Sequence, residues 1–381
     1  TALTRRTLQT TEQFCRHAAF ELDVRVADGD LSDMRSLYGD EVPFAHQSGA
    51  DLGERLHDAV PRALDSGARR VLVVGTDCPE LAPAILKQAA NALESTDGVI
   101  GPALDGGYYL SGLRAASPEL FQTIAWGTGA VLAQTLAAAA RLGLRVHQLS
   151  PLSDIDEPQD LLVWRRVAGA LPGTPAAIHS NSVSIVIPAL NEADVITTTI
   201  RPLLGMPNVE VIVADGGSTD RTAEIAHDLG VRVVVSRRGR GRQMNAGAAV
   251  ADGARLLFLH ADTRLPPDFV AHVDAVLSPV ECAGAFRLRI DGDRRAFRWI
   301  EWGANARSRF LQSPYGDQAL FLSSDLFYQL GGFKELALME DVDLCRRLRR
   351  HGQVGLADAE ALTSARRWER LGPVRTTLMN Q

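Results

Sequence analysis

Short apolar segments of the sequence end in residues that could bind a cation or a nucleotide. Val209–Val213, which is rich in β-branched residues, leads into Asp215. Leu256–Leu259 leads into His260 and Asp262. We expect both segments to be buried strands. Ligands of open α/β sheets bind outside the carboxyl ends of the strands, so the sequence predicts a nucleotide site at Asp215 and a metal site at Asp262. His260 is either a second metal ligand or a structural histidine.

The turn after Asp215 has the composition of a binding loop that leads into a helix. Two glycines permit a sharp turn, and Ser218–Asp220 offers three residues that can cap a helix over Arg221–Leu229. The start of a helix presents unpaired N–H groups that attract anions. Asn191 and Glu192, which follow another apolar segment, either cap a helix or hydrogen-bond a base and ribose.

A cluster of arginines and glycines lies at Arg237–Arg242, in a chain whose net charge is −6. Because the cluster is local, it favours a small polyanion such as a diphosphate and gives no indication of nucleic acid binding. Gly239 lets the backbone approach a phosphate, and Arg240 and Arg242 offer guanidinium groups that match phosphate geometry. We expect a phosphate-binding loop here; a solvated basic loop is the alternative.

A carboxylate occupies an unusual position in the segment Leu338–Leu348. As a helix, this segment would bury a stripe of Asp341, Leu344, Cys345 and Leu348. An acid therefore heads an apolar face, and a positioned base is worth about 10²–10⁴-fold in rate. The sequence predicts that Asp341 is a general base; a buried acid that accepts from first-turn N–H groups is the alternative.

The first half of the chain holds further acids at the ends of expected strands or in loops. Asp77 follows the apolar segment Val71–Val74, and Asp105 and Asp156 come later in the same half. Hard cations prefer carboxylate oxygens, so we expect these three acids to converge on one Mg²⁺ or Mn²⁺. For Asp156 the alternative is a cap on the helix that begins nearby.

Length and composition describe a globular protein with room for two domains. The chain has 381 residues, of which 46% are hydrophobic and 23% charged. Its four cysteines show no metal or disulfide spacing, which predicts a reduced, cytoplasmic protein. We expect neither a signal peptide nor a membrane span, since no apolar run approaches about 18 residues.

One expected helix, Arg294–Leu311, is basic and carries Trp299, Trp302 and Phe310. We expect it to pack in the core. The alternatives are a wall of an acceptor site and a peripheral contact with a membrane.

The two halves repeat one pattern of apolar strand, acid and helix, which predicts two tandem α/β domains. Between them, residues 172–182 are rich in Pro, Ala and Ser and read as a linker. The expected domains are therefore residues 1–171 and 183–381. Each is expected to be Rossmann-like, with a mixed, mostly parallel sheet flanked by helices.

The first half resembles the DUF2064 family, also called transferase 1 of a radical-SAM/selenodomain-associated pair. The resemblance is carried by Gly75–Pro79, Gly101–Tyr109, Trp126–Thr128 and Asp154–Pro158. That family is similar to nucleotidyltransferases and to GT-A glycosyltransferases, which implies a GT-A-like domain here. Its first strand and basic glycine-containing loop would precede Thr1, so we expect a domain that lacks both.

The second half resembles family 2 glycosyltransferases of the GT-A fold, in the subgroup called transferase 2 of the same pair. The matching residues are Pro188, Asn191, Glu192, Asp215–Asp220 with Gly217 and Ser218, Gly239–Asn245, Asp262, Tyr315–Gln318 with Asp317, Glu340 and Asp341. The usual metal motif of the family is Asp-x-Asp, and His260 takes its first position here.

The resemblance implies the inverting transfer of a sugar from a nucleotide-diphosphate donor to an acceptor hydroxyl. Asp215 would contact the base, Asp262 would hold Mg²⁺ or Mn²⁺ on the diphosphate, and Asp341 would deprotonate the acceptor. Pro188, Asn191, Glu192, Gly217, Ser218, Gly239, Arg240, Arg242 and Asn245 would help to bind the donor, and Glu340 and Asp317 would join Asp341 in catalysis. A UDP-sugar is the commonest donor of the family; the acceptor is a lipid, a small metabolite or a glycan.

Two other roles remain open for the first half. It is either a sugar-phosphate nucleotidyltransferase that makes the activated sugar, or a non-catalytic docking module. The fusion of two related folds motivates the first alternative, and the expected lack of the first strand and loop favours the second.

Overall fold

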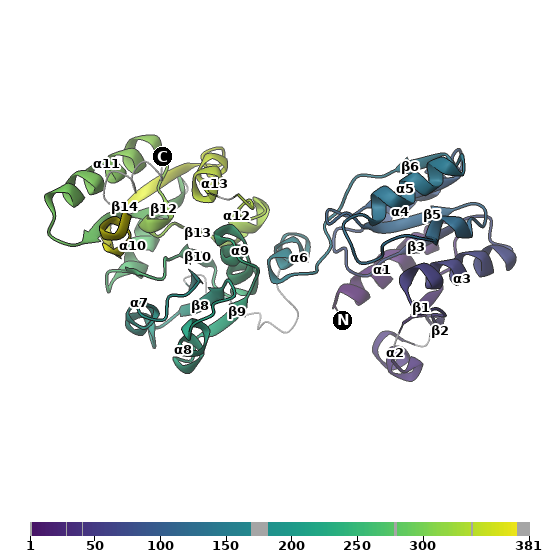
Figure 1. Ribbon diagram of the computed structural model, residues 1–381, viewed down its shortest axis with the longest axis horizontal. Coiled ribbons are helices and arrows are strands. Elements are labelled where there is room, and N and C mark those ends of the chain that lie inside the picture. Colours follow the sequence, from purple (N-terminus) through teal and green to yellow (C-terminus); the bar gives the residue numbers. More distant parts are fainter. Residues whose placement is uncertain are drawn as a thin grey trace. The chain divides into compact units, whose positions relative to one another are not determined.

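The computed structural model describes residues 2–27, 29–39, 41–168, 182–277, 280–336 and 338–371. The chain divides into two compact units, Thr1–Asp156 and Glu157–Gln381. Each unit combines helices with a mixed sheet, so the predicted α/β class is confirmed (Figure 1).

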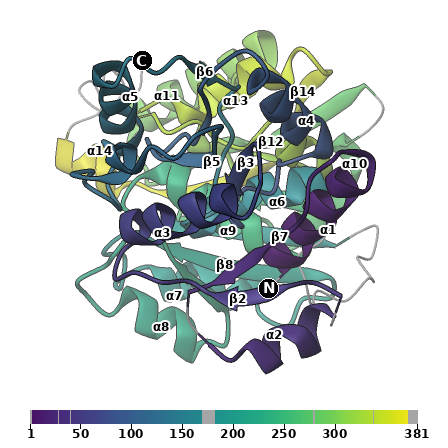
Figure 2. The same cartoon turned by 90° about the vertical axis from the view of Figure 1, so that its right-hand side faces the viewer.

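The first unit contains a four-stranded sheet and a separate two-stranded pair. Its elements are α1 (Ala2–His17), β1 (Val24–Val26), α2 (Leu31–Tyr38), β2 (Phe44–His46), α3 (Leu52–Asp65), β3 (Val71–Val74), α4 (Pro83–Ala92), β4 (Gly98–Pro102), β5 (Tyr108–Leu113), α5 (Val131–Arg141) and β6 (Val146–Gln148). The sheet order is β3-β5-β4-β6; β5 is antiparallel to both neighbours and β4 is parallel to β6. The parallel pair of β1 and β2 lies beside α2 (Figures 1 and 2).

The second unit is built on an eight-stranded mixed sheet. Its elements are α6 (Leu161–Ala168), β7 (Val183–Ala189), α7 (Ile196–Ile200), β8 (Val209–Asp215), α8 (Thr222–Asp228), β9 (Arg232–Val235), α9 (Arg240–Val250), β10 (Arg255–Phe258), β11 (Thr263–Arg264), α10 (Phe269–Val276), β12 (Glu281–Asp291), α11 (Arg295–Leu311), β13 (Phe321–Ser323), α12 (Ser324–Gln329), α13 (Glu340–Leu348), β14 (Gln353–Ser364) and α14 (Arg366–Leu371). The order is β11-β14-β12-β13-β10-β7-β8-β9. The neighbours β10, β7, β8 and β9 are all parallel, so their carboxyl ends meet at one edge.

Alternate residues of the central strand β7 build the cores on the two faces of this sheet. Ile185 and Ile187 are fully buried in one core, and Val186 is fully buried in the other. This is the two-residue period of a strand that is covered on both sides. Helices α7, α8 and α10 contribute to the first core, and α6, α9, α12 and α13 to the second. Figures 1 and 2 show α9 on the opposite side of β8 from α7 and α8.

The boundary between the compact units lies before α6, earlier than the domain boundary expected near residue 171. Leu162 of α6 is buried in the second core of the sheet. The Arg165 guanidinium donates to the carbonyl oxygens of Ala249 and Ala251 at the end of α9, at 3.1 and 2.6 Å. Buried apolar and hydrogen-bonded groups thus join α6 to the second unit. The expected linker 172–182 lies almost wholly outside the described residues.

The expectation that helix α11 packs its aromatic residues in the core is wrong, because only one face of the helix is buried. Phe297 is fully buried, whereas Trp299, Trp302 and Phe310 are 74%, 69% and 78% exposed. Among the described helices, none is both long and apolar enough to cross a membrane.

Candidate functional site

A cavity of about 260 Å³ lies where β7 and β10 end. Pro188 and Ala189 close β7, and His260 and Asp262 follow β10, so adjacent parallel strands deliver these residues to one edge. The lining residues are Pro188, Ala189, Leu190, Glu192, Arg240, Gln243, His260, Ala261, Asp262, Asp317, Thr363 and Trp368. The structure therefore brings together six predicted site residues that are separated in sequence.

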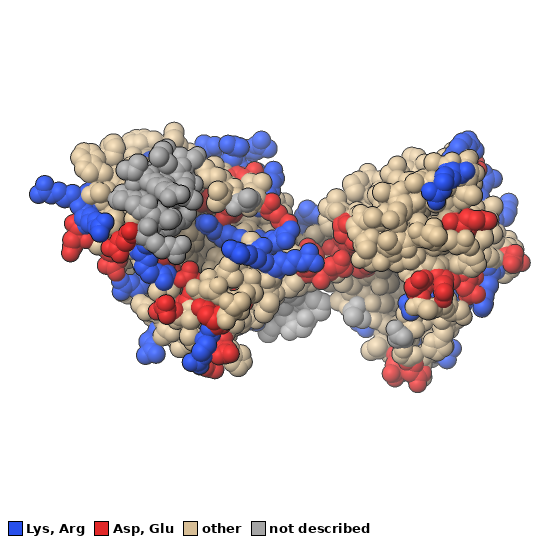
Figure 3. Space-filling model, in the orientation of Figure 1, with Lys and Arg blue, Asp and Glu red and all other residues tan. Residues whose placement is uncertain are grey.

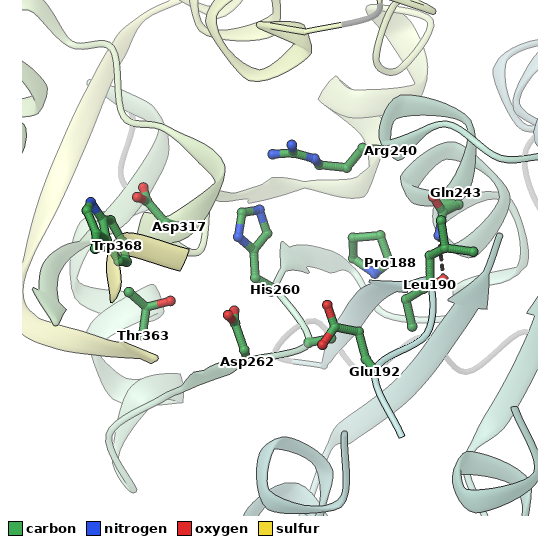
Figure 4. Close-up of a pocket in the computed structure, with 12 residues that line it drawn as sticks. Pro188, Leu190, Glu192, Arg240, Gln243, His260, Asp262, Asp317, Thr363 and Trp368 are labelled. Carbon is green, nitrogen blue, oxygen red and sulfur yellow. Dashed lines mark hydrogen bonds between the residues drawn. The ribbon is translucent and has the colours of Figure 1, made fainter. Parts of the chain in front are cut away.

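Charged groups of both signs face this cavity (Figure 4). The carboxylates of Asp262 and Glu192 lie near each other on one side of His260, and Arg240 and Asp317 lie on the other. The side chains of Asp262 and Glu192 are only 23% and 29% exposed. Carboxylates with this degree of burial attract a cation, and Arg240 attracts an anion.

Arg366, at the start of α14, is a cation that the sequence interpretation missed. Its guanidinium lies 2.8 Å from a Glu192 carboxylate oxygen and 3.8 Å from an Asp262 oxygen. Glu192 and Arg366 are 174 residues apart, so no local pattern indicates their contact. Trp368 follows on the same helix and is buried against the cavity. The last described helix therefore closes one side of the site.

Asp341 lies just behind the cavity, at the start of α13. One of its carboxylate oxygens accepts a hydrogen bond from the Gly316 N–H at 2.7 Å, and the other accepts one from the Val342 N–H at 2.8 Å. Gly316 begins the turn that carries Asp317 into the cavity. A β-carbon on Gly316 would lie 2.7 Å from the His260 ring, so glycine lets this turn approach His260. Asp341 is 8% exposed and is outside the set of lining residues.

Glu340 connects α13 to the arginine that lines the cavity. Its carboxylate lies 3.2 Å from the Arg240 guanidinium and is almost completely buried. Burial raises the pKa of Glu340 above its ordinary value, and the Arg240 charge opposes that rise. Leu344, Cys345 and Leu348 are fully buried, which confirms the predicted apolar stripe of this helix. Glu340 thus fixes the position of Arg240.

The expected phosphate-binding loop is wrong in its secondary structure, because a helix begins within it. Gly239 has a φ of 144° and caps α9, and Arg240 and Arg242 lie in the first turn of that helix. Gly241 of the predicted loop and Gly247 farther along α9 are needed for packing instead. A β-carbon on Gly241 would lie 2.9 Å from the Lys334 carbonyl oxygen, and one on Gly247 would collide with a neighbouring side chain.

Two predicted donor-binding residues of α9 bind other parts of the second unit. Arg242 forms an ion pair with Glu335 at 2.6 Å. The Asn245 amide is buried and makes hydrogen bonds to the Phe333 carbonyl oxygen and N–H, both at 2.8 Å. Neither side chain lines the cavity. Figure 3 shows a group of basic side chains, in blue, on the surface of the second unit.

Asp215 is the last residue of β8 and holds its own turn. Its carboxylate accepts hydrogen bonds from the N–H groups of Gly217 and Ser218, at 3.0 and 2.9 Å, and from the Ser218 hydroxyl. The Asn191 side-chain oxygen accepts from the Thr219 N–H at 2.8 Å, which links the turns after β7 and β8. Asp215 pairs with Ala189 across the sheet, so it borders the cavity without lining it.

The first unit gathers a different set of acids from the one expected. Carboxylate oxygens of Asp105, Asp154 and Asp156 all lie within 4.8 Å of one another. Burial and the negative charges of Asp105, Asp156 and Asp77 raise the pKa of Asp154 to about 6. Asp154 thus forms a cluster with Asp105 and Asp156, two of the three predicted residues. Its position two residues before Asp156 was the feature of the sequence that could have indicated this.

Family models match both halves of the chain. Residues 10–128 match DUF2064, described as an uncharacterized protein conserved in bacteria. Residues 184–328 match glycosyl transferase family 2. The predicted tandem arrangement is therefore confirmed.

The similar proteins include several bacterial transferases. A PGL/p-HBAD biosynthesis glycosyltransferase of Mycobacterium bovis is 33% identical over 161 residues, which cover 39% of this chain and 62% of the relative. A glucosyl-3-phosphoglycerate synthase of Mycolicibacterium smegmatis is 33% identical over 28% of this chain and 38% of the relative. The solved glucosyl-3-phosphoglycerate synthase of Mycobacterium tuberculosis is 21% identical, with a TM-score of 0.37, and covers 52% of this chain and 78% of that one. The chain thus spans less than two thirds of the length of the first two of these relatives.

Proposed function

We propose that the second unit, which matches glycosyl transferase family 2 over residues 184–328, is an inverting, metal-dependent glycosyltransferase that uses a nucleotide-sugar donor. One observation carries the proposal: Asp262, His260, Asp317 and Arg240 line a single cavity at the carboxyl edge of the parallel strands. The curated relatives include a PGL/p-HBAD biosynthesis glycosyltransferase, which supports this class of activity. Groups of both charges at this edge suit a donor diphosphate together with a divalent cation.

The residues around Asp262 fit a divalent cation. Asp262 offers carboxylate oxygens, which Mg²⁺ and Mn²⁺ prefer, and the nitrogen of His260 favours Mn²⁺ over Mg²⁺. The Arg366 guanidinium, 3.8 Å from Asp262, supports a site for positive charge. When bound, the metal would neutralise charge on the leaving diphosphate.

The remaining donor contacts come from Arg240 and Asp215. Arg240 lines the cavity at the start of the 11-residue helix α9, where the helix dipole also favours an anion. A carboxylate has about four acceptor positions, and the turn after β8 uses three of those of Asp215. We assign the remaining position to an N–H group of the nucleotide base, in keeping with a uridine nucleotide.

Asp341 is the proposed general base. Two backbone N–H groups hold its carboxylate, so the group is fixed before the acceptor arrives. The acceptor O–H proton passes to Asp341 while the oxygen forms a bond to the anomeric carbon. The bond from that carbon to the phosphate oxygen breaks on the opposite face, and the nucleoside diphosphate leaves with the electron pair.

The transfer of a radiolabelled sugar from UDP-glucose, UDP-N-acetylglucosamine or GDP-mannose tests this function. With a working donor and acceptor, Asp341→Asn should lower kcat by about 10²–10⁴-fold while UDP or GDP binding stays unchanged. Asp317→Asn is the matched variant, because Asp317 lines the cavity and Asp341 does not. Full activity of Asp341→Asn together with loss of activity in Asp317→Asn would move the base to Asp317.

The acids of the first unit favour a second activity, sugar-phosphate nucleotidyl transfer. Asp105, Asp154 and Asp156 converge closely enough to share one Mg²⁺. Pyrophosphate release from a nucleoside triphosphate plus a sugar phosphate, lost in Asp156→Asn, would support it. If the full chain releases no pyrophosphate while sugar transfer proceeds, the first unit is better explained as a docking module.

A further inference from the structure

The outward face of α11 is an exposed aromatic surface that lies outside the cavity. Trp302 follows Trp299 by three residues and Phe310 follows Trp302 by eight, so all three side chains lie on one side of the helix. Each is more than two thirds exposed, and Leu311 next to them is 60% exposed. Large exposed apolar groups gathered in this way mark a surface that binds a partner.

The opposite face of α11 holds the helix in a fixed place. Phe297 and Ala304 pack into a cluster with Leu288, Ile290 and Trp368. The rings of Trp299 and Trp302 lie edge to face, with centroids 6.4 Å apart. The aromatic surface is therefore part of an anchored helix, which Figure 1 shows along the margin of the second unit.

The charges of this helix are almost all positive on its exposed side. Arg294, Arg295 and Arg309 are exposed. Glu301, the single acid between residues 295 and 311, is 6% exposed and pairs with Arg298 at 3.1 Å. Asp293, just before the helix, is the nearest exposed acid in the sequence. The surface thus combines aromatic rings with free positive charge, although the whole chain is acidic.

We propose that this face of α11 docks the protein onto a membrane surface that contains anionic lipids. Tryptophan and phenylalanine side chains insert at the level of the headgroups, and arginines bind the lipid phosphates. A second copy of the chain fits this surface less well, because a two-fold contact would place the arginines of one copy against those of the other.

The inward face of α11 also contacts the turn beside the cavity. The Ser308 hydroxyl donates to the Gln318 side-chain oxygen at 2.6 Å, and the Arg307 guanidinium lies 3.4 Å from the centre of the Tyr315 ring. These contacts connect α11 to the turn that carries Asp317 into the cavity. Ser308 is buried on the inward face of α11, opposite the aromatic side chains, so these contacts fix the docked helix to the wall of the cavity.

Co-sedimentation of the full chain with vesicles tests the proposal without any enzyme assay. We expect binding to phosphatidylcholine vesicles that contain phosphatidylglycerol, and much weaker binding to phosphatidylcholine alone. Replacing Trp299, Trp302 and Phe310 by alanine should lower the partition coefficient by about tenfold for each side chain. Arg295→Glu with Arg309→Glu should weaken binding to the anionic vesicles only.

Leu104→Ala is the matched control, because Leu104 is 68% exposed but lies in the first unit. It should bind vesicles like the original chain, and circular dichroism should show every variant folded. No binding of the original chain to anionic vesicles, or equal binding of the alanine variant, would overturn the proposal. So would a dimer in solution that the alanine variant converts to a monomer, since a second copy would then cover α11. Loss of vesicle binding with sugar transfer to a soluble acceptor retained would separate docking from catalysis.

Discussion

Arg366 and Asp262 form a charge contact at the proposed metal site of the cavity. The guanidinium of Arg366 competes for the carboxylate that we assign to the cation. Both groups are partly exposed, so the contact is worth about 0.2–1 kcal/mol. We therefore expect Arg366→Ala to bind Mn²⁺ about two- to fivefold more tightly in calorimetry without nucleotide. Weaker Mn²⁺ binding in this variant would mean that Arg366 organises the site and does not compete for it.

Asp154 makes the stability of the first unit depend on pH. Its pKa is about 6 in the folded protein, above the ordinary value of 3.8. The folded state therefore holds the proton more tightly, and this contribution to stability is present below about pH 4 and is lost as pH rises through about 6. Asp154→Asn should raise the thermal midpoint at pH 7. It should also make the midpoint depend less on pH between about pH 4 and pH 6.

Thermal unfolding of the full chain, with a chelator to remove cations, measures this effect. Asp97→Asn is a control on another acid of the same unit, whose pKa is lowered by a hydrogen bond from the Arg145 N–H. It should lower the midpoint at pH 7. An unchanged pH profile in Asp154→Asn would contradict the coupling among the three acids.

Local patterns predicted the elements on which several candidate residues stand. Asp215 and Asp262 follow β-branched or apolar segments that became β8 and β10, and Asp341 heads a stripe that is buried as expected. Arg366 could not be found in this way, because its partner is 174 residues away. Contacts between such distant residues depend on the topology of the sheet. Short-range periodicity in the sequence gives no information about that topology.

At the level of the elements, the close packing of α9 against the sheet positions Arg240 and Gln243. Gly247 lies against Val186 of β7, and a β-carbon there would collide with it. Gly247→Ala should therefore lower the free energy of unfolding by about 1–3 kcal/mol. Gly303→Ala in α11 is the matched control, because no atom lies within 4 Å of its added β-carbon.

Gly303→Ala should raise the free energy of unfolding by about 0.5–1 kcal/mol, since alanine favours a helix. Urea unfolding measures both variants. Equal effects of the two substitutions would show that backbone propensity alone, without packing, explains the glycines of α9.

The same helix explains why its secondary structure was not predicted. Eight of its residues are buried, and its glycines, alanines and polar groups show no apolar stripe. The exposed aromatic residues of α11 were unexpected for a related reason. Hydrophobic residues usually pack inside, so the sequence favoured core packing and left an acceptor wall or a membrane contact as alternatives.

For the whole molecule, the tandem of two α/β units was predictable because each half repeats the order of apolar strand, acid and helix. The boundary between the units was harder to predict. The sequence before α6 resembles the first half, yet α6 itself packs on α9 of the second unit. Two acidic sites in one chain also raise the question of which one binds the nucleotide diphosphate. We assign the nucleotide diphosphate to the second unit, because Arg240 and Asp262 line one cavity there.

Calorimetric titration of the full chain with UDP and with GDP, each with and without Mn²⁺, tests that assignment most directly. We predict binding that requires Mn²⁺, is abolished by Asp262→Asn and is unaffected by Asp105→Asn. Binding that survives Asp262→Asn and is lost in Asp105→Asn would place the nucleotide in the first unit and contradict the assignment.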